Sequence, residues 1–116
     1  GSQIWEALEN GVSQVEQNAG RFPQVSGMSF TWNPKAEVGS RVVSVEIGGR
    51  PLSKGKTYTV ATNDYLANGG DGYSVFKKGK VIIDASGATY LANMVMNYIK
   101  AKGTVSPKVE GRIVAQ

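Results

Sequence analysis

A strand-like run that leads directly into a glycine-rich loop constrains the fold of this chain more than any other feature. Residues 57–62 alternate β-branched and aromatic side chains with other residues, as half-buried strands do. The loop that follows holds three glycines in four positions, at Gly69, Gly70 and Gly72. Glycines permit positive φ angles and let the backbone come close to a ligand. We therefore expect a strand that ends at a tight bend.

Two side chains near this bend have complementary binding chemistry. Tyr65 has a flat aromatic face that can stack on a ring, and Asp71 has a carboxylate that can accept hydrogen bonds from paired hydroxyls. Together they suit a nucleoside, with the base on the tyrosine and the ribose on the acid. The same residues are also typical of an ordinary turn, in which Asp71 bonds its own backbone and Tyr65 packs in a core.

Other ligand-binding loops fit the stretch less well. No Gly-Lys-Ser or Gly-Lys-Thr follows the glycines, so a phosphate-binding P-loop is excluded. Asp64 and Asp71 do not have the alternating spacing of a calcium-binding EF-hand loop, and the bidentate glutamate that would end such a loop is missing.

The residue types that the chain lacks limit its chemistry further. It has no cysteine and no histidine, which excludes thiolate and imidazole metal sites and every nucleophile system that depends on histidine. Its nine acidic residues do not cluster, so we expect no catalytic residue, no metal site and no bound cofactor in this chain. The net charge of +4 comes from scattered lysines and arginines, without the basic and aromatic interleaving of nucleic-acid binders. We therefore expect no nucleic-acid partner.

Hydrophobic periodicity predicts one α+β domain over residues 1–116, with a mixed, largely antiparallel sheet packed with two main amphipathic helices. The first helix is expected at about residues 2–18, with Ser2 as its cap, and the second at about residues 87–102. The apolar face of the second helix is expected in the core and consists of Tyr90, Leu91, Met94, Val95, Tyr98 and Ile99.

Strands are expected at residues 28–33 and 41–47, and Gly48-Gly49 predicts a hairpin after the second of these. Residues 81–84 are expected to form a buried extended run, and residues 112–115 an edge strand. The side chains of the strand at 41–47 that are expected to face inward are Val43, Val45 and Ile47. Asp84 or Ser86 is expected to cap the second helix, and Gly103 to end it. No apolar run is long enough to predict a transmembrane segment.

Three blocks of the sequence resemble the C-terminal domain of the 5′-nucleotidase family. They are the run from Asn63 to Tyr73, the block from Gly20 to Gly27 (Gly-Arg-Phe-Pro-Gln-Val-Ser-Gly), and residues 109–113 (Val-Glu-Gly-Arg-Ile). The blocks occur in the order that the family has, and between them the resemblance covers nearly the whole chain.

The resemblance implies a role for individual residues. Tyr65 corresponds to the second ring of an aromatic pair that stacks on the base, and Asp71 to the acid that bonds the ribose hydroxyls. Many members have phenylalanine at the Tyr65 position, a change that keeps the stacking face. Backbone contacts from Asn68, Gly69 and Gly70 are further candidates. The other ring of the pair and the residues that contact phosphate would all lie before Gly1, so the chain resembles the distal part of the substrate-binding domain.

The resemblance also implies what the parent protein does. An N-terminal metallophosphatase domain of the same polypeptide would hold two divalent metal ions, such as zinc or manganese, and activate water. The parent would convert nucleoside monophosphates to nucleoside and phosphate in an extracellular, periplasmic or cell-surface location. This chain would bind the nucleoside or nucleotide and be inactive alone. Alternatives are the same domain from a UDP-sugar hydrolase or a 2′,3′-cyclic-nucleotide phosphodiesterase, or a non-catalytic binding or structural module.

Overall fold

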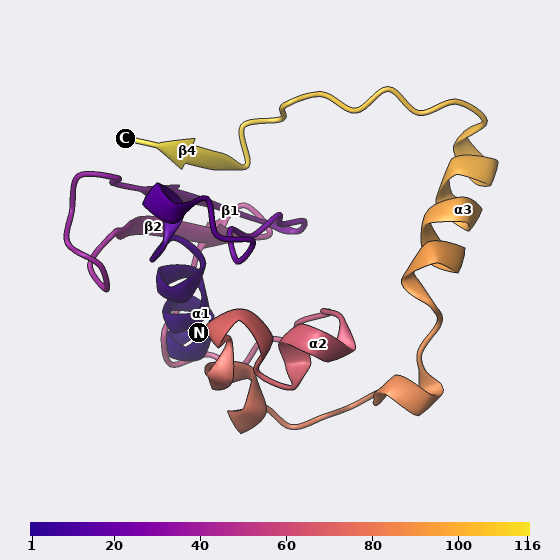
Figure 1. Ribbon diagram of the computed structural model, residues 1–116, viewed down its shortest axis with the longest axis horizontal. Coiled ribbons are helices and arrows are strands. Elements are labelled where there is room, and N and C mark those ends of the chain that lie inside the picture. Colours follow the sequence, from indigo (N-terminus) through magenta and orange to yellow (C-terminus); the bar gives the residue numbers. More distant parts are fainter.

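Two regions of different packing make up the structure, a computed structural model that describes residues 1–116 (Figure 1). The first region, here called the packed body, comprises residues 1–79 and the last strand, β4 (Ile113–Ala115). The second, here called the arm, comprises residues 80–112. It carries helix α3 (Leu91–Lys102) at a distance from the body and returns to the body at β4.

A four-stranded sheet forms one layer of the packed body, in the order β3-β2-β1-β4. Strand β2 (Val42–Ile47) pairs antiparallel with both β1 (Met28–Trp32) and β3 (Arg50–Pro51). The edge strand β4 pairs parallel with β1. The predicted fold class, α+β with a mixed, largely antiparallel sheet, is therefore confirmed, as are the hairpin at Gly48-Gly49 and the strand at the C-terminal end.

A bulge changes which side chains of β2 face inward. Thr31 pairs with Ser44, but the next residue, Trp32, pairs with Val42, so Val43 is an extra residue on its strand. The extra residue breaks the alternation of sides. As a result Val42 and Val45 are buried and Val43 is exposed. The prediction that Val43 faces inward was wrong for this reason.

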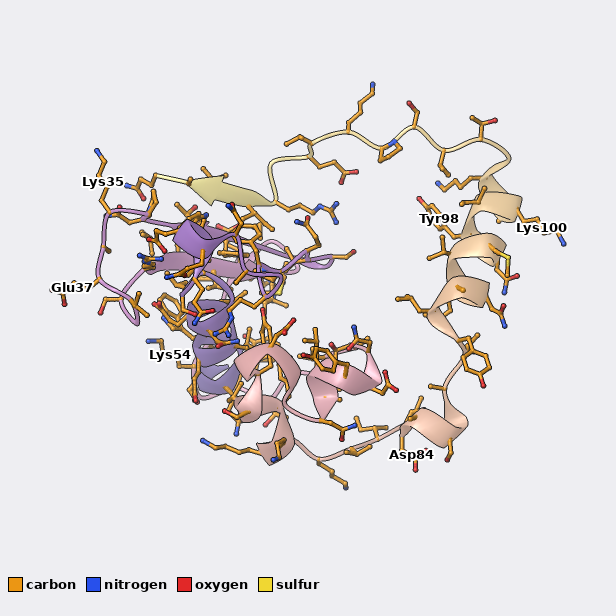
Figure 2. The ribbon with its side chains drawn as sticks, viewed as in Figure 1. Lys35, Glu37, Lys54, Asp84, Tyr98 and Lys100 are labelled. Atoms are coloured by element: carbon orange, nitrogen blue, oxygen red, sulfur yellow. The ribbon has the colours of Figure 1, made fainter.

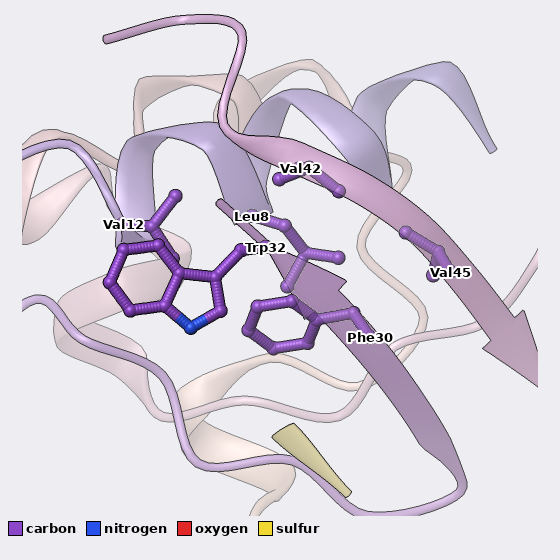
Figure 3. Packing of buried hydrophobic residues seen from close by; sticks show 6 residues of the cluster. All are labelled: Leu8, Val12, Phe30, Trp32, Val42 and Val45. Atoms are coloured by element: carbon purple, nitrogen blue, oxygen red, sulfur yellow. The ribbon is translucent and has the colours of Figure 1, made fainter. Parts of the chain in front are cut away.

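The core lies between this sheet and helix α1 (Ser2–Gly11). The apolar stripe of α1 and the residue after it, Val12, place their side chains on the inner face of β1 and β2. Figure 3 shows this cluster, which consists of Leu8, Val12, Phe30, Trp32, Val42 and Val45. Burial of this apolar stripe against the sheet is the main stabilisation available to a helix of this length.

The first helix is shorter than the sequence predicts. It ends at Gly11, and after a turn only a short 3₁₀ helix, Val15–Gln17, follows. Ser2 does not cap it, because the N-cap is Gly1. A Cβ atom at Gly11 would lie 2.8 Å from both Cδ of Pro23 and the hydroxyl oxygen of Tyr73. Glycine therefore allows a close approach of the chain at this point.

A buried arginine joins α1 to the sheet. Arg41 donates from Nη1 to the carbonyl of Val12 at 2.7 Å and from Nε to that of Ala36 at 3.0 Å, and it forms an ion pair with Glu16. The hydrogen bond from Arg41 holds the pKa of Glu16 below its usual value. The carboxylate of Glu9 accepts from the N–H groups of Arg41 and Val42 at 3.0 and 2.9 Å.

Three sequence predictions about burial and pairing were wrong. Residues 57–62 form no strand, and their backbone groups take part in no backbone hydrogen bond. Residues 81–83 are exposed instead of buried, and so is the apolar face of α3. Asp84 caps only the short 3₁₀ helix Ala85–Gly87. Helix α3 begins at Leu91, with Tyr90 as its N-cap, and not at residue 87. It ends at Gly103, as predicted. The common reason for the lost pairing and burial is that no described element packs against these segments.

Candidate functional site

The glycine-rich loop begins with a short, capped helical turn. Oδ1 of Asn63 accepts from the N–H of Leu66 at 2.8 Å and thereby caps helix α2 (Asp64–Ala67), which carries Tyr65. The chain then takes positive φ angles at Gly69, Asp71 and Gly72. Aspartate is one of the few residues that tolerate this region of backbone space, so its presence between glycines is compatible with the bend.

The loop brings the two predicted binding residues into direct contact. The hydroxyl of Tyr65 donates to Oδ1 of Asp71 at 3.0 Å. The tyrosine ring lies over Gly70, where a Cβ atom would be only 2.5 Å from Cζ of the ring. The Tyr65 residue is 57% exposed. The expectation that Tyr65 packs in a core is therefore wrong, and the ring is accessible from solvent, although Gly70–Gly72 do form a tight turn.

Helix α1 holds this loop in place through a residue that sequence reasoning missed. Nδ2 of Asn10 donates to the carbonyl of Asp71 at 3.0 Å, while its Oδ1 accepts from Nη1 of Arg21 at 3.1 Å. A Cβ at Gly72 would lie 2.6 Å from that same Oδ1, so glycine is needed for the approach. Arg21 belongs to one of the blocks that resemble the family. Asn10 has no comparable sequence signal, because it is one polar residue on an amphipathic helix.

A buried tyrosine forms the base of the loop. Tyr73 donates its hydroxyl to the carbonyl of Arg21 at 2.6 Å and stacks on Phe76 with ring centroids 5.3 Å apart. Burial raises the pKa of Tyr73 to about 12; nearby Arg21 opposes this rise and Asp71 adds to it. Tyr73 is therefore a neutral hydrogen-bond donor at physiological pH, and its bond to Arg21 attaches the end of the loop to residues 20–27.

An apolar groove of about 580 Å³ lies beside this loop. Its walls are α1, residues 20–28, residues 58–62 and the side chains of Leu66, Tyr73 and Phe76. Neither Tyr65 nor Asp71 lines it, so their pair lies on open surface next to the groove. The structure thus brings the predicted pair together but does not enclose it.

The side chains of the loop are suited to binding a ligand. No three potential ligands among His, Cys, Asp and Glu lie close enough together to hold a metal ion. The two metal ions that the resemblance implies therefore do not fit any residues of this chain. An exposed aromatic ring beside a carboxylate can stack on a planar group and accept hydrogen bonds from hydroxyls. None of the helices has the length and apolar character needed to cross a membrane.

Comparisons with known proteins show what this chain is similar to. The family model for the 5′-nucleotidase, C-terminal domain, matches residues 1–78. The chain is 43% identical, over 97% of its length, to the trifunctional nucleotide phosphoesterase protein YfkN of Bacillus subtilis, of which it covers 8%. It is 38% identical, over 98% of its length, to a 5′-nucleotidase of Diplobatis ommata, of which it covers 21%.

A solved structure extends the similarity to three dimensions. The crystal structure of a 5′-nucleotidase precursor from Thermus thermophilus superposes with a TM-score of 0.91 and 42% identity, over 98% of this chain and 23% of that one. The chain spans less than a quarter of this protein and of the relatives above. This chain therefore belongs to the 5′-nucleotidase family and corresponds to part of the family's C-terminal domain.

Proposed function

We propose that this chain is the distal part of the nucleotide-recognition domain of a secreted, metal-dependent 5′-nucleotidase. The observation that carries the proposal is the contact between Tyr65 and Asp71, which fixes an exposed ring beside an acid. The names of the relatives support it, since they are a 5′-nucleotidase and a nucleotide phosphoesterase.

The two side chains divide the recognition of the nucleoside between them. Tyr65 stacks on the base with the face that does not cover Gly70, an interaction that contributes about 1–3 kcal/mol per base. The bond from its hydroxyl keeps the ring in place and occupies only Oδ1 of Asp71. Oδ2 is left to accept a ribose hydroxyl. The geometry therefore favours a ligand that has a planar base and adjacent hydroxyls.

Backbone contacts from the loop are more restricted than the sequence suggests. The N–H groups of Asn68 and Gly69 already donate to carbonyls of α2, to Asp64 at 2.9 Å and to Leu66 at 2.9 Å. Of the three candidate positions, Gly70 is the one with an N–H group that is not used within the loop. We therefore propose the Gly70 amide as the backbone contact to the ligand.

The rest of the reaction is assigned to the parent polypeptide. A metallophosphatase domain with two divalent ions, such as zinc or manganese, would supply the activated water. This chain's residues bind and orient the nucleoside. We propose an extracellular, periplasmic or cell-surface location, supported by relatives that include snake venom 5′-nucleotidases and a protein described as a precursor.

The test is phosphate release by the full-length parent from a panel of nucleoside monophosphates, with divalent metal and with chelator. Tyr65→Ala is expected to raise KM roughly 5- to 150-fold, which is the equivalent of about 1–3 kcal/mol of lost stacking. Tyr65→Phe should keep most of the affinity, and Lys35→Ala, on the loop that joins β1 to β2, is the control. Unchanged KM and kcat in Tyr65→Ala would show that the chain is a non-catalytic module.

The second candidate is the same domain from a UDP-sugar hydrolase or a 2′,3′-cyclic-nucleotide phosphodiesterase, favoured by the similarity to a trifunctional nucleotide phosphoesterase of Bacillus subtilis. The same panel therefore includes a UDP-sugar and a 2′,3′-cyclic nucleotide. Both contain a base and a ribose, so Tyr65→Ala would weaken their binding too, and the substrate with the highest kcat/KM decides between the candidates.

A further inference from the structure

We propose that the hydroxyl of Tyr65 determines which sugars the site accepts. By occupying Oδ1 of Asp71, it limits the acid to a single ribose hydroxyl, so that the parent protein also takes deoxyribonucleoside monophosphates as substrates. The proposal rests on the nucleotide-recognition function stated above and adds the sugar specificity of the same site.

The acceptor capacity of Asp71 is divided unequally between its two carboxylate oxygens. Oδ1 accepts from the hydroxyl of Tyr65 at 3.0 Å, whereas Oδ2 accepts no hydrogen bond within the chain. Asp71 takes part in neither of the two salt bridges of the chain. A carboxylate binds the two hydroxyls of a ribose most directly when it offers one oxygen to each. In this chain one of those oxygens is already occupied.

A ligand hydroxyl competes with the Tyr65 hydroxyl at a disadvantage. A phenol is more acidic than a sugar alcohol and is therefore the stronger hydrogen-bond donor to a carboxylate. The phenol is also carried by the same loop, so it loses no translational freedom on binding, as a ligand does. The second ribose hydroxyl therefore meets an oxygen that already has a donor, and it contributes little to affinity.

The backbone on both sides keeps this contact in place. Helix α2 carries Tyr65 with its ring over Gly70, where a Cβ atom would be 2.5 Å from Cζ of the ring. Asp71 is half-buried, and its carbonyl accepts from Nδ2 of Asn10 at 3.0 Å. The ring and the acid are thus each fixed by a separate contact, and their hydrogen bond is part of the folded loop.

Removal of a single oxygen atom would change the sugar specificity and keep the stacking face. In Tyr65→Phe the ring keeps its face for the base, and Oδ1 of Asp71 loses its donor. Both carboxylate oxygens are then free to accept hydroxyls. Phenylalanine at this position therefore predicts recognition of both ribose hydroxyls, and tyrosine predicts recognition of one.

Deoxy substrates count the hydroxyls that the site recognises. The full-length parent is assayed with the nucleoside monophosphate that has the highest kcat/KM and with its 2′-deoxy and 3′-deoxy forms. In the native protein one deoxy form is expected to lose about 10- to 150-fold in kcat/KM, the equivalent of one hydrogen bond to a charged group, and the other to stay within about threefold. In Tyr65→Phe both forms are expected to lose about tenfold or more. A strong loss for both forms in the native protein, or unchanged ratios in Tyr65→Phe, would overturn the proposal.

Each comparison is a ratio between substrates in one variant, so changes in folding or in base stacking cancel. Asp71→Asn tolerates the same positive φ and removes the charge, so adding Tyr65→Phe to it should leave the deoxy ratios unchanged. A rise in discrimination in that double variant would contradict a role through Asp71. Lys35→Ala should keep the native ratios, because Lys35 lies across the packed body from α2 (Figure 2).

Failure of this proposal and failure of the nucleotide-recognition function give different results. If Tyr65→Ala leaves KM unchanged for every nucleotide, the recognition function fails and the sugar specificity falls with it. If Tyr65→Ala raises KM but the deoxy ratios do not respond to Tyr65→Phe, the ring binds the base and only the role of its hydroxyl is wrong.

Discussion

The packed body and the arm contain helices of the same kind with opposite burial. In α1 the stripe residue Leu8 is 5% exposed, whereas in α3 the stripe residue Leu91 is 64% exposed. Both helices have apolar residues at spacings of three and four, so periodicity alone does not separate them. The difference is that α1 has β1 and β2 opposite it and α3 has no element opposite it. Periodicity therefore identifies the face of a helix that needs a partner, but not whether the same stretch of chain supplies one.

The largest expected effect comes from truncating one leucine in each helix. Leu8→Ala should lower the free energy of unfolding of the isolated chain by about 2.7–5 kcal/mol, because it removes buried methyl groups and leaves a cavity. Leu91→Ala in the same chain should change it by no more than about 0.5 kcal/mol, since Leu91 is already in solvent. Urea unfolding measures both. A large loss in Leu91→Ala would contradict the distinction between the two regions.

The next effect is a loss of stability at high pH that originates in the packed body. Burial raises the pKa of Tyr73 to about 12, above the ordinary value of about 10 for tyrosine. The folded state binds the phenol proton of Tyr73 more tightly than the unfolded state does. Its contribution to the free energy of unfolding is therefore complete below about pH 10 and is lost as the pH rises from about 10 to 12. The expected loss is roughly 2–3 kcal/mol. Unfolding measured across this range in the native chain and in Tyr73→Phe isolates the contribution, which the variant should lack.

A smaller effect is expected at the junction of α1 and β2. Arg41→Ala leaves the carbonyl of Val12 without its buried donor and should cost about 1–3 kcal/mol. The loss of the ion pair adds little, because Glu16 is exposed. Arg41→Lys keeps the charge but not the planar guanidinium, whose separate nitrogens reach separate acceptors, so it should recover only part of the stability. Full recovery by lysine in a thermal unfolding experiment would show that charge, and not the geometry of the donors, joins the helix to the sheet.

The smallest effect tests how the packed body positions the binding loop. Asn10→Ala removes the hydrogen bond to the carbonyl of Asp71 and the one from Nη1 of Arg21, and should cost about 1–2 kcal/mol of stability. In the full-length parent we expect KM for a nucleoside monophosphate to rise about fivefold with kcat unchanged, because binding and not chemistry is affected. Ser13→Ala is the control, because it removes hydrogen bonds to the carbonyl of Asn10 and from Arg21 but none to the loop itself. A change in kcat alone would contradict this role for Asn10.

Local pattern predicted those parts of the fold that find their partners within the chain. The hairpin at Gly48-Gly49, strand β1 and the end of α3 at Gly103 follow from turn glycines and alternation, which act over a few residues. The inward register of β2 did not follow, because a bulge at Val43 depends on pairing with β1. The burial of residues 81–83 and of α3 could not follow either, because burial requires a second element, and none of the described elements lies against these segments.

The candidate site divides in the same way. Tyr65 and Asp71 are recognisable because they stand in a distinctive glycine-rich sequence, and the structure places them in contact; their role in binding stays a prediction. Asn10 was not predictable, because its contact with Asp71 spans 61 residues of sequence. Long-range polar contacts of this kind depend on how α1 lies across the loop, which the packing of its apolar face decides.

The return of the chain to β1 through β4 has a consequence for the order of assembly. Parallel pairing of β4 with β1, together with a hydrogen bond of 2.6 Å from Nη1 of Arg112 to the carbonyl of Val25, attaches the far end of the arm to the body. Ribosomal synthesis delivers α3 before β4, so the arm is at first tethered at one end only. During that interval the apolar side of α3 is exposed, and pairing of β4 with β1 afterwards attaches the second end of the arm to the body. Deleting residues 113–116 should therefore leave the arm attached to the body through residues 79–80 and the bond from Arg112 alone.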